Sequence, residues 1–71
     1  MLKVGCNYRI TKQVKDKKLS RRICELGFYV GSVICLKHIS IFKKSYIFVV
    51  KNVAVSLTKN IVEEMGLVYE R

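Results

Sequence analysis

The side chains that could carry chemistry in this 71-residue chain are few: one histidine, three cysteines and five carboxylates. Cys35 and His38 lie three positions apart in a segment that is typical of a strand, so they should point to opposite faces unless a bulge intervenes. The three cysteines, which include Cys6 and Cys24, show no Cys-x-x-Cys spacing. A zinc site or a disulfide framework is therefore disfavoured, and we expect reduced thiols in a cytosolic protein with no tight metal site.

Catalytic patterns are missing as well. The glycines of residues 27–31 lack the Lys-Ser/Thr pair that a phosphate-binding loop needs. One histidine and scattered carboxylates supply no pair of nucleophile and base. We therefore expect no enzyme, no catalytic residue and no bound cofactor.

The strongest chemical signal is charge, because 14 basic and five acidic side chains give a net charge of +9. Such an excess favours an acidic protein partner, the anionic inner leaflet of a membrane, or nucleic acid. The cations are densest in residues 12–22, although runs of charge are usually solvated surfaces. The candidate partner-binding cations are Lys12, Lys17, Lys18 and Arg21, with Arg22 at the edge of an apolar stripe.

A helix over residues 16–26 should position these cations. Leu19, Ile23 and Leu26 recur at helical spacing and predict one apolar stripe. Asp16 is a plausible N-cap, and Gly27 is well placed to end the helix with Phe28 folding back onto it.

The remaining segments read as short strands and one more helix. We expect strands at residues 5–14, 33–39 with a bulge, 46–51, 53–57 and 67–69. A tight turn at Lys51-Asn52 joins the third and fourth strands, and a short helix capped by Thr58 precedes the last. The fold class is therefore mainly β with short helices: a small, partly open five-stranded barrel, with one helix after the first strand and one before the last.

A second candidate surface lies on the third strand. If Tyr46, Phe48 and Val50 face the core, then Ile47 and Val49 face outward, where a solvated strand would carry polar groups. These two residues, together with Phe42 in the preceding loop, are candidate partner-binding or weakly self-associating residues. The alternative is that the second helix, or the loop with Ile41 and Phe42, covers this face.

The chain resembles the family of ferrous iron transport protein A, FeoA. The resemblance rests on the opening Leu2-Lys3-Val4-Gly5, on the segment from Arg21 through Leu26-Gly27-Phe28 to Gly31, and on the Lys51-Asn52 turn followed by Leu57. It implies a single SH3-like domain over residues 1–71, in the cytosol or at the inner face of the membrane. Residues 1–7 lack the apolar stretch of a secretion signal, so we expect no secretion, and no apolar run is long enough to span a bilayer.

The resemblance also implies a partner: FeoB, a membrane ferrous iron transporter with a cytosolic G-domain. Fe(II) would then be linked to this chain only through the transport system. Two alternatives come from other classes. A basic barrel can bind nucleic acid, with Tyr8, Tyr29 and Tyr46 as stacking candidates, although these are spread along the chain. The chain could also be the SH3-like tail of a metal-dependent regulator.

Overall fold

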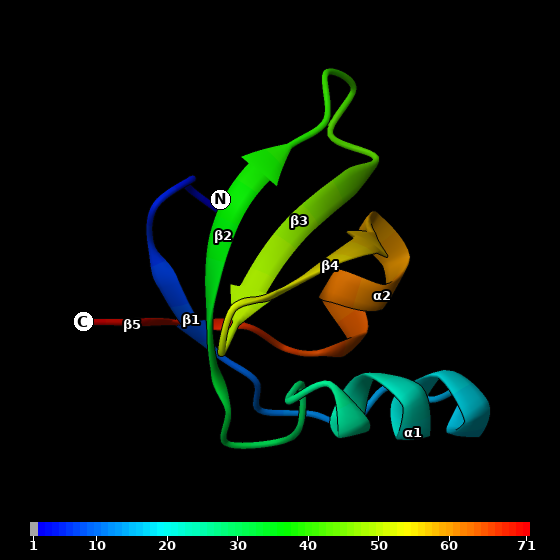
Figure 1. Cartoon of the computed structure of the whole chain (residues 1–71). Helices are drawn as coiled ribbons and strands as arrows, with labels where there is room; N and C mark the ends of the chain where they lie inside the picture. The colour runs from blue at the N-terminus through cyan, green and yellow to red at the C-terminus, as the bar shows by residue number, and fades with distance from the viewer. Residues whose placement is uncertain (1) are drawn as a thin grey trace.

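A computed structural model describes residues 2–71 as five strands and two helices in one compact unit (Figure 1). The elements follow one another as β1 (Asn7–Arg9), α1 (Lys17–Glu25), β2 (Val33–Ile39), β3 (Ser45–Val50), β4 (Val53–Thr58), α2 (Lys59–Glu64) and β5 (Val68–Glu70). The predicted class is confirmed: the fold is mainly β, with one helix after the first strand and one before the last, as in an SH3-like barrel.

The five strands form one antiparallel sheet in the order β4-β3-β2-β1-β5. The sheet is strongly twisted, and α2 links its two edge strands, β4 and β5 (Figure 1). The register of β2 against β3 shifts between Leu36 and His38, which confirms the predicted bulge. The predicted turn between β3 and β4 is also present, with positive φ at both Lys51 and Asn52.

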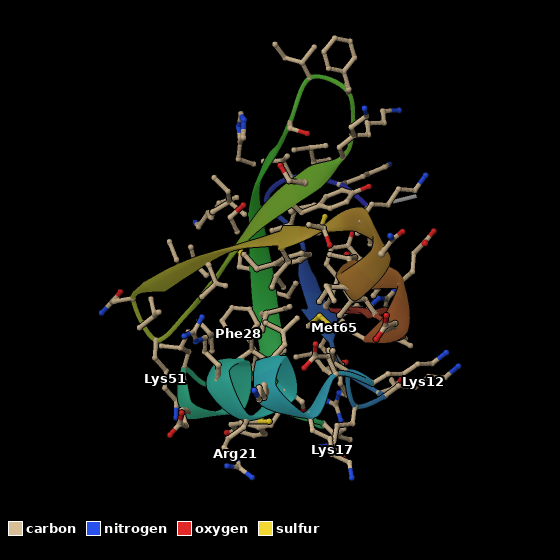
Figure 2. The ribbon with its side chains drawn as sticks, turned by 90° about the vertical axis from the view of Figure 1, so that its right-hand side faces the viewer. Lys12, Lys17, Arg21, Phe28, Lys51 and Met65 are labelled. Carbon is tan, nitrogen blue, oxygen red and sulfur yellow. The ribbon has the colours of Figure 1, made fainter. Side chains whose placement is uncertain are left out.

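The core fills the concave side of this sheet. Its largest fully buried side chains come from separate elements: Phe28 follows α1, Ile34 and Leu36 lie on β2, Phe48 on β3, and Met65 ends α2. Phe28 closes the end of the barrel next to α1, where Figure 2 labels it above that helix. Most of this core was expected from the alternation of apolar residues along the strands.

The first strand is much shorter than predicted. The prediction placed a strand over residues 5–14, whereas β1 covers only Asn7–Arg9. The buried Ile10 and Val14 continue the apolar pattern beyond it in irregular backbone, where the Thr11 and Lys12 N–H groups both donate to the Met65 carbonyl at 3.1 Å. An alternating apolar pattern indicates that one side of a segment is buried. Irregular backbone that packs against a core gives the same pattern as a strand.

Helix α1 has the predicted ends. Asp16 Oδ1 accepts a hydrogen bond from the Leu19 N–H at 3.0 Å. At the other end Gly27 has φ +107°, its N–H donates to the Cys24 carbonyl at 3.0 Å, and the Phe28 N–H donates to the Ile23 carbonyl at 2.8 Å. This pair of bonds is the Schellman arrangement. The predicted apolar stripe is only partly buried, because Leu26 lies at the exposed end of the helix.

Candidate interaction surfaces

The outward side of α1 is rich in basic side chains. Leu19, Ser20 and Ile23 turn toward the barrel, so Lys17, Lys18, Arg21 and Arg22 lie on the solvent side and are exposed. Arg22 is exposed and lines the same shallow hollow as Leu19 of the apolar stripe, so the packing of its stem there stays a prediction. Figure 2 shows Lys17 and Arg21 pointing away from the sheet.

Lys51 joins this surface from the β3–β4 turn. Val50 lies against the end of α1, because a β-carbon built on Gly27 would be 3.1 Å from Val50 Cγ1. That contact brings Lys51 to the same end of the molecule as Arg21, Lys17 and Lys12 (Figure 2). We call this region the basic end and define it by the six cations Lys12, Lys17, Lys18, Arg21, Arg22 and Lys51. Sequence reasoning missed Lys51, which is far from α1 along the chain.

The cations of the basic end have no carboxylate partner. Within residues 2–71 the one ion pair joins Arg9 Nη2 to Glu70 Oε1 at 2.6 Å, away from α1. Asp16 is engaged in capping the helix, and Glu25 is the other acidic side chain of this helix segment. A surface with this composition attracts negative charge over a range of about 10 Å at ordinary ionic strength.

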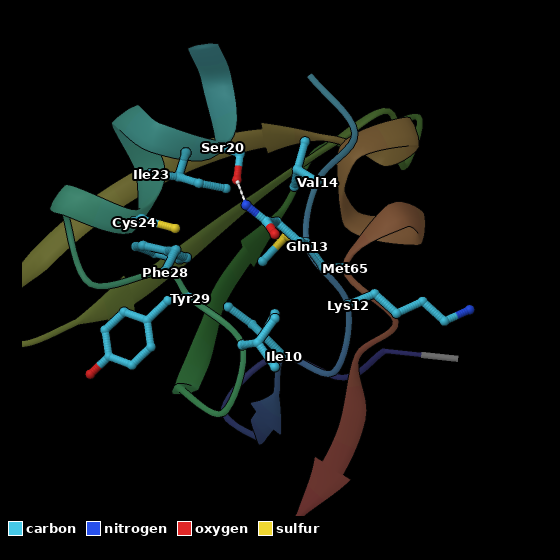
Figure 3. A pocket seen from close by; sticks show the side chains of 11 residues that line it. Ile10, Lys12, Gln13, Val14, Ser20, Ile23, Cys24, Phe28, Tyr29 and Met65 are labelled. Carbon is cyan, nitrogen blue, oxygen red and sulfur yellow. Dashed lines mark hydrogen bonds between the residues drawn. The ribbon is translucent and has the colours of Figure 1, made fainter. Parts of the chain in front are cut away.

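An apolar groove runs between α1 and the barrel (Figure 3). It has a volume of about 290 Å³, and apolar side chains from four segments line it, among them Ile10, Val14, Ile23, Phe28 and Met65. Gln13 Nε2 donates to Ser20 Oγ at 3.1 Å across one wall. Lys12 and Tyr29 stand at its margin and extend outward (Figure 3). Periodicity could not predict this groove, because it forms where four segments meet.

The loop between β2 and β3 presents two apolar side chains to solvent. Ile41 is 91 % exposed and Phe42 is 80 % exposed. The expectation that these residues could fold over the outer face of the sheet is therefore wrong. The loop projects from the end of the molecule opposite α1 (Figure 1).

The outer, convex face of the sheet has an apolar centre. Val49 lies between Cys35 and Ala54, and Ile47 lies between His38 and Ser56, so all six share this face. Ile47 and Val49 are half-buried by these strand neighbours. The alternative in which α2 covers this face is wrong, since α2 places Val62 and Met65 in the core on the other side.

The six predicted partner-binding residues thus fall on three separate surfaces. Lys18, Arg21 and Arg22 belong to the basic end, Phe42 lies at the β2–β3 loop, and Ile47 and Val49 lie on the outer face.

Comparison with models of protein families shows which family the chain belongs to. The model of the FeoA domain matches residues 1–68. The chain belongs to the FeoA domain family. Comparison with curated proteins gave no match, and neither did comparison with solved structures. Membership ties this FeoA domain to ferrous iron transport, in a family of accessory domains that is not known for enzymes.

The bulge in β2 changes one expectation about metal ligands in this FeoA domain. Cys35 pairs with Val49 and His38 pairs with Ile47, so the bulge brings Cys35 and His38 to the same face instead of opposite faces. Among residues 2–71 there is still no group of three or more His, Cys, Asp or Glu side chains that could hold a metal ion. Two donors alone do not make a closed site for a transition metal.

The three tyrosines proposed for base stacking are not brought together. Tyr8 is buried, with its hydroxyl accepting a hydrogen bond from the Lys3 N–H at 2.7 Å. Tyr46 is half-buried against the core, and Tyr29 stands alone at the margin of the groove.

Neither helix in the described part of this FeoA domain is long and apolar enough to cross a bilayer.

Proposed function

We propose that this FeoA domain is a non-enzymatic, cytosolic accessory of ferrous iron uptake that acts by protein contact with the transporter FeoB, through its cytosolic G-domain. The observation that carries the proposal is the basic end, where six cations without carboxylate partners gather at one end of the molecule and one of them, Lys12, lines an apolar groove. Fe(II) is the cargo of the transport system in this proposal, and this chain holds no cofactor.

The basic end combines two features that protein recognition uses. An apolar groove takes an anchoring side chain, and a polar rim sets the orientation and the rate of encounter. The floor of the groove consists of core residues such as Phe28 and Met65, so it is held in place by the fold. Its complement is a segment with an apolar side chain flanked by carboxylates, on the G-domain of FeoB.

Charge reversal at the basic end tests this proposal. Lys18→Glu with Arg21→Glu changes the charge by four units without touching the core. Binding to the isolated cytosolic domain of FeoB, with and without guanine nucleotide, should weaken about tenfold at low salt. The difference from the unaltered chain should shrink as salt screens the charges.

Lys43→Glu with Lys44→Glu is the matched control, because it makes the same charge change at the opposite end of the molecule. It should leave binding to the FeoB domain nearly unchanged in solution. Equal losses of affinity in both double variants would show a nonspecific charge effect. Equal affinity of Lys18→Glu/Arg21→Glu and the unaltered chain at low salt would exclude the basic end as the surface that binds FeoB.

Nucleic acid binding is tested in parallel, since it would use the same cations. A gel shift at about 150 mM salt should show no retained complex, because binding that rests on phosphate contacts alone fades steeply with ionic strength. A sequence-selective complex that survives this salt would favour the nucleic acid alternative over FeoB.

A further inference from the structure

We propose that the β2–β3 loop is a membrane anchor, in which Ile41 and Phe42 insert into the surface of an anionic bilayer while Lys43 and Lys44 contact the lipid phosphates. This inference goes beyond contact with FeoB and does not depend on it. The loop lies at the end of the molecule away from the basic end (Figures 1 and 2).

The first observation is exposure. Among the exposed large apolar residues of the described chain, Ile41 and Phe42 are the most exposed, at 91 % and 80 %. They are neighbours at the tip of a hairpin, so both side chains can enter a lipid layer together. Two adjacent apolar side chains at a convex tip are of the kind that membrane-surface proteins insert at the headgroup boundary.

The second observation is that the loop has its own hydrogen bonds. Ser40 Oγ accepts from the N–H groups of Lys44 at 3.0 Å and Ser45 at 3.1 Å. The Lys43 N–H donates to the Ser40 carbonyl at 2.9 Å, and Lys43 has φ +57°. These bonds fix a tight turn that directs Ile41 and Phe42 away from the sheet before any ligand is present.

The third observation is charge. The segment from Lys37 to Ile47 contains Lys37, Lys43 and Lys44 and no carboxylate. Lys59 is close by, because its N–H donates to the Lys44 carbonyl at 2.9 Å. Lysines beside an inserted tip can extend to lipid phosphates while their stems contact the acyl boundary. These four lysines supply the attraction to the bilayer, because the cations of the basic end lie at the other end of the molecule, beyond the screening length of about 10 Å.

The shape of the loop favours lipid over a protein as its ligand. A specific protein interface buries about 800 Å² on each partner, and two side chains on a narrow tip supply only a small part of that area. Reversible membrane binding needs only a modest apolar insertion joined to a basic patch, and the loop provides both.

Insertion through this loop would orient the domain. The long dimension of the molecule is 28 Å, and α1 lies at the end opposite the loop. The basic end would then face away from the bilayer, about one domain diameter from the headgroups, and stay free for a protein partner.

Tryptophan fluorescence tests the insertion directly, because the chain contains no tryptophan. In Phe42→Trp the emission should shift to the blue on addition of phosphatidylcholine vesicles that contain phosphatidylglycerol, and brominated lipid should quench it. Vesicles of phosphatidylcholine alone should give a much smaller change. Tyr29→Trp, which places the probe near the basic end, should show neither effect.

Vesicle co-sedimentation of serine variants supplies the second measurement. Ile41→Ser with Phe42→Ser should lower partitioning to the anionic vesicles at least about tenfold, since the inserted apolar surface is lost at constant charge. Val30→Ser with Val68→Ser is the matched control, because these valines are exposed elsewhere, and it should partition like the unaltered chain.

Three results would overturn the proposal. Equal partitioning of the two serine double variants would show adsorption by charge alone, and an unshifted Phe42→Trp emission would show that the tip stays in water. If Ile41→Ser with Phe42→Ser lost binding to the FeoB domain in lipid-free solution but still bound vesicles, Ile41 and Phe42 would belong to a protein interface. Failure of the FeoB proposal would appear separately, in the Lys18→Glu/Arg21→Glu variant.

Discussion

Gly27 lies against Val50 so closely that a β-carbon on Gly27 would be 3.1 Å from Val50 Cγ1. The contact joins the end of α1 to the β3–β4 turn, and it requires a residue without a side chain that also accepts φ +107°. One glycine therefore ends the helix, seats Phe28 in the core and holds Lys51 beside the cations of α1.

Gly27→Ala should destabilise the domain by more than about 2 kcal/mol, because the backbone strain of a positive φ adds to the contact with Val50. Gly31→Ala is the matched control, since Gly31 has φ +94° but nothing within 4 Å of an added β-carbon. It should lose about 1–2 kcal/mol from strain alone. Urea unfolding measures both, and equal losses would contradict a close approach of Val50.

The helix end could be predicted from the sequence because its determinants are local. Asp16, Gly27 and Phe28 act within one or two turns of the residues they bond, so their types and spacing carry the information. The strands β2 to β4 were predictable for a similar reason, since each alternation of apolar residues spans a single element.

The capping bond of Asp16 is testable by two substitutions with the same charge change. Asp16→Ala removes the side-chain acceptor that the Leu19 N–H uses, and it should cost about 1 kcal/mol. Asp16→Asn keeps an oxygen at the same place and should cost much less. Chemical denaturation at constant pH and salt compares them, and a matching loss in Asp16→Asn would assign the effect to charge instead of the cap.

The surfaces were harder to predict than the elements. The groove depends on Ile10, Ser20 and Met65, which meet only after the chain has folded, and no sequence period links them. The cations of α1 were recognised, but Lys51 and the exposure of Phe42 depend on how hairpins project from the sheet. The length of β1 was overestimated because burial of Ile10 and Val14 continues past the last strand bond.

The chain itself should bind Fe(II) no more tightly than a surface histidine does. Cys35 and His38 share a face, but their strand partners there are Val49 and Ile47, which offer no donor atoms. Anaerobic calorimetry should show no stoichiometric binding at micromolar Fe(II), because tight transition-metal sites use three or four protein ligands. Cys35→Ser and His38→Ala should leave the heats unchanged, and a micromolar site lost in either variant would contradict the prediction.

The outer face should support weak self-association that strengthens with salt. Val49 and Ile47 form the apolar centre of a sheet face that neither α2 nor the β2–β3 loop covers, so two copies could pair through it. Each copy carries a net charge of +9, and the repulsion between them opposes pairing until salt screens it. The mean mass in sedimentation equilibrium should therefore rise with protein concentration at about 0.5 M salt and less at 0.05 M.

Val49→Lys should abolish that rise, because pairing would bury a lysine ammonium against the same residue of the other copy. Val30→Lys adds the same charge at an exposed position off this face, so it separates loss of the apolar contact from added repulsion. A rise that persists in Val49→Lys, or disappears equally in Val30→Lys, would exclude the outer face as the contact. Since binding to FeoB through the basic end should weaken with salt, the opposite salt dependence of pairing distinguishes the two surfaces in one series of buffers.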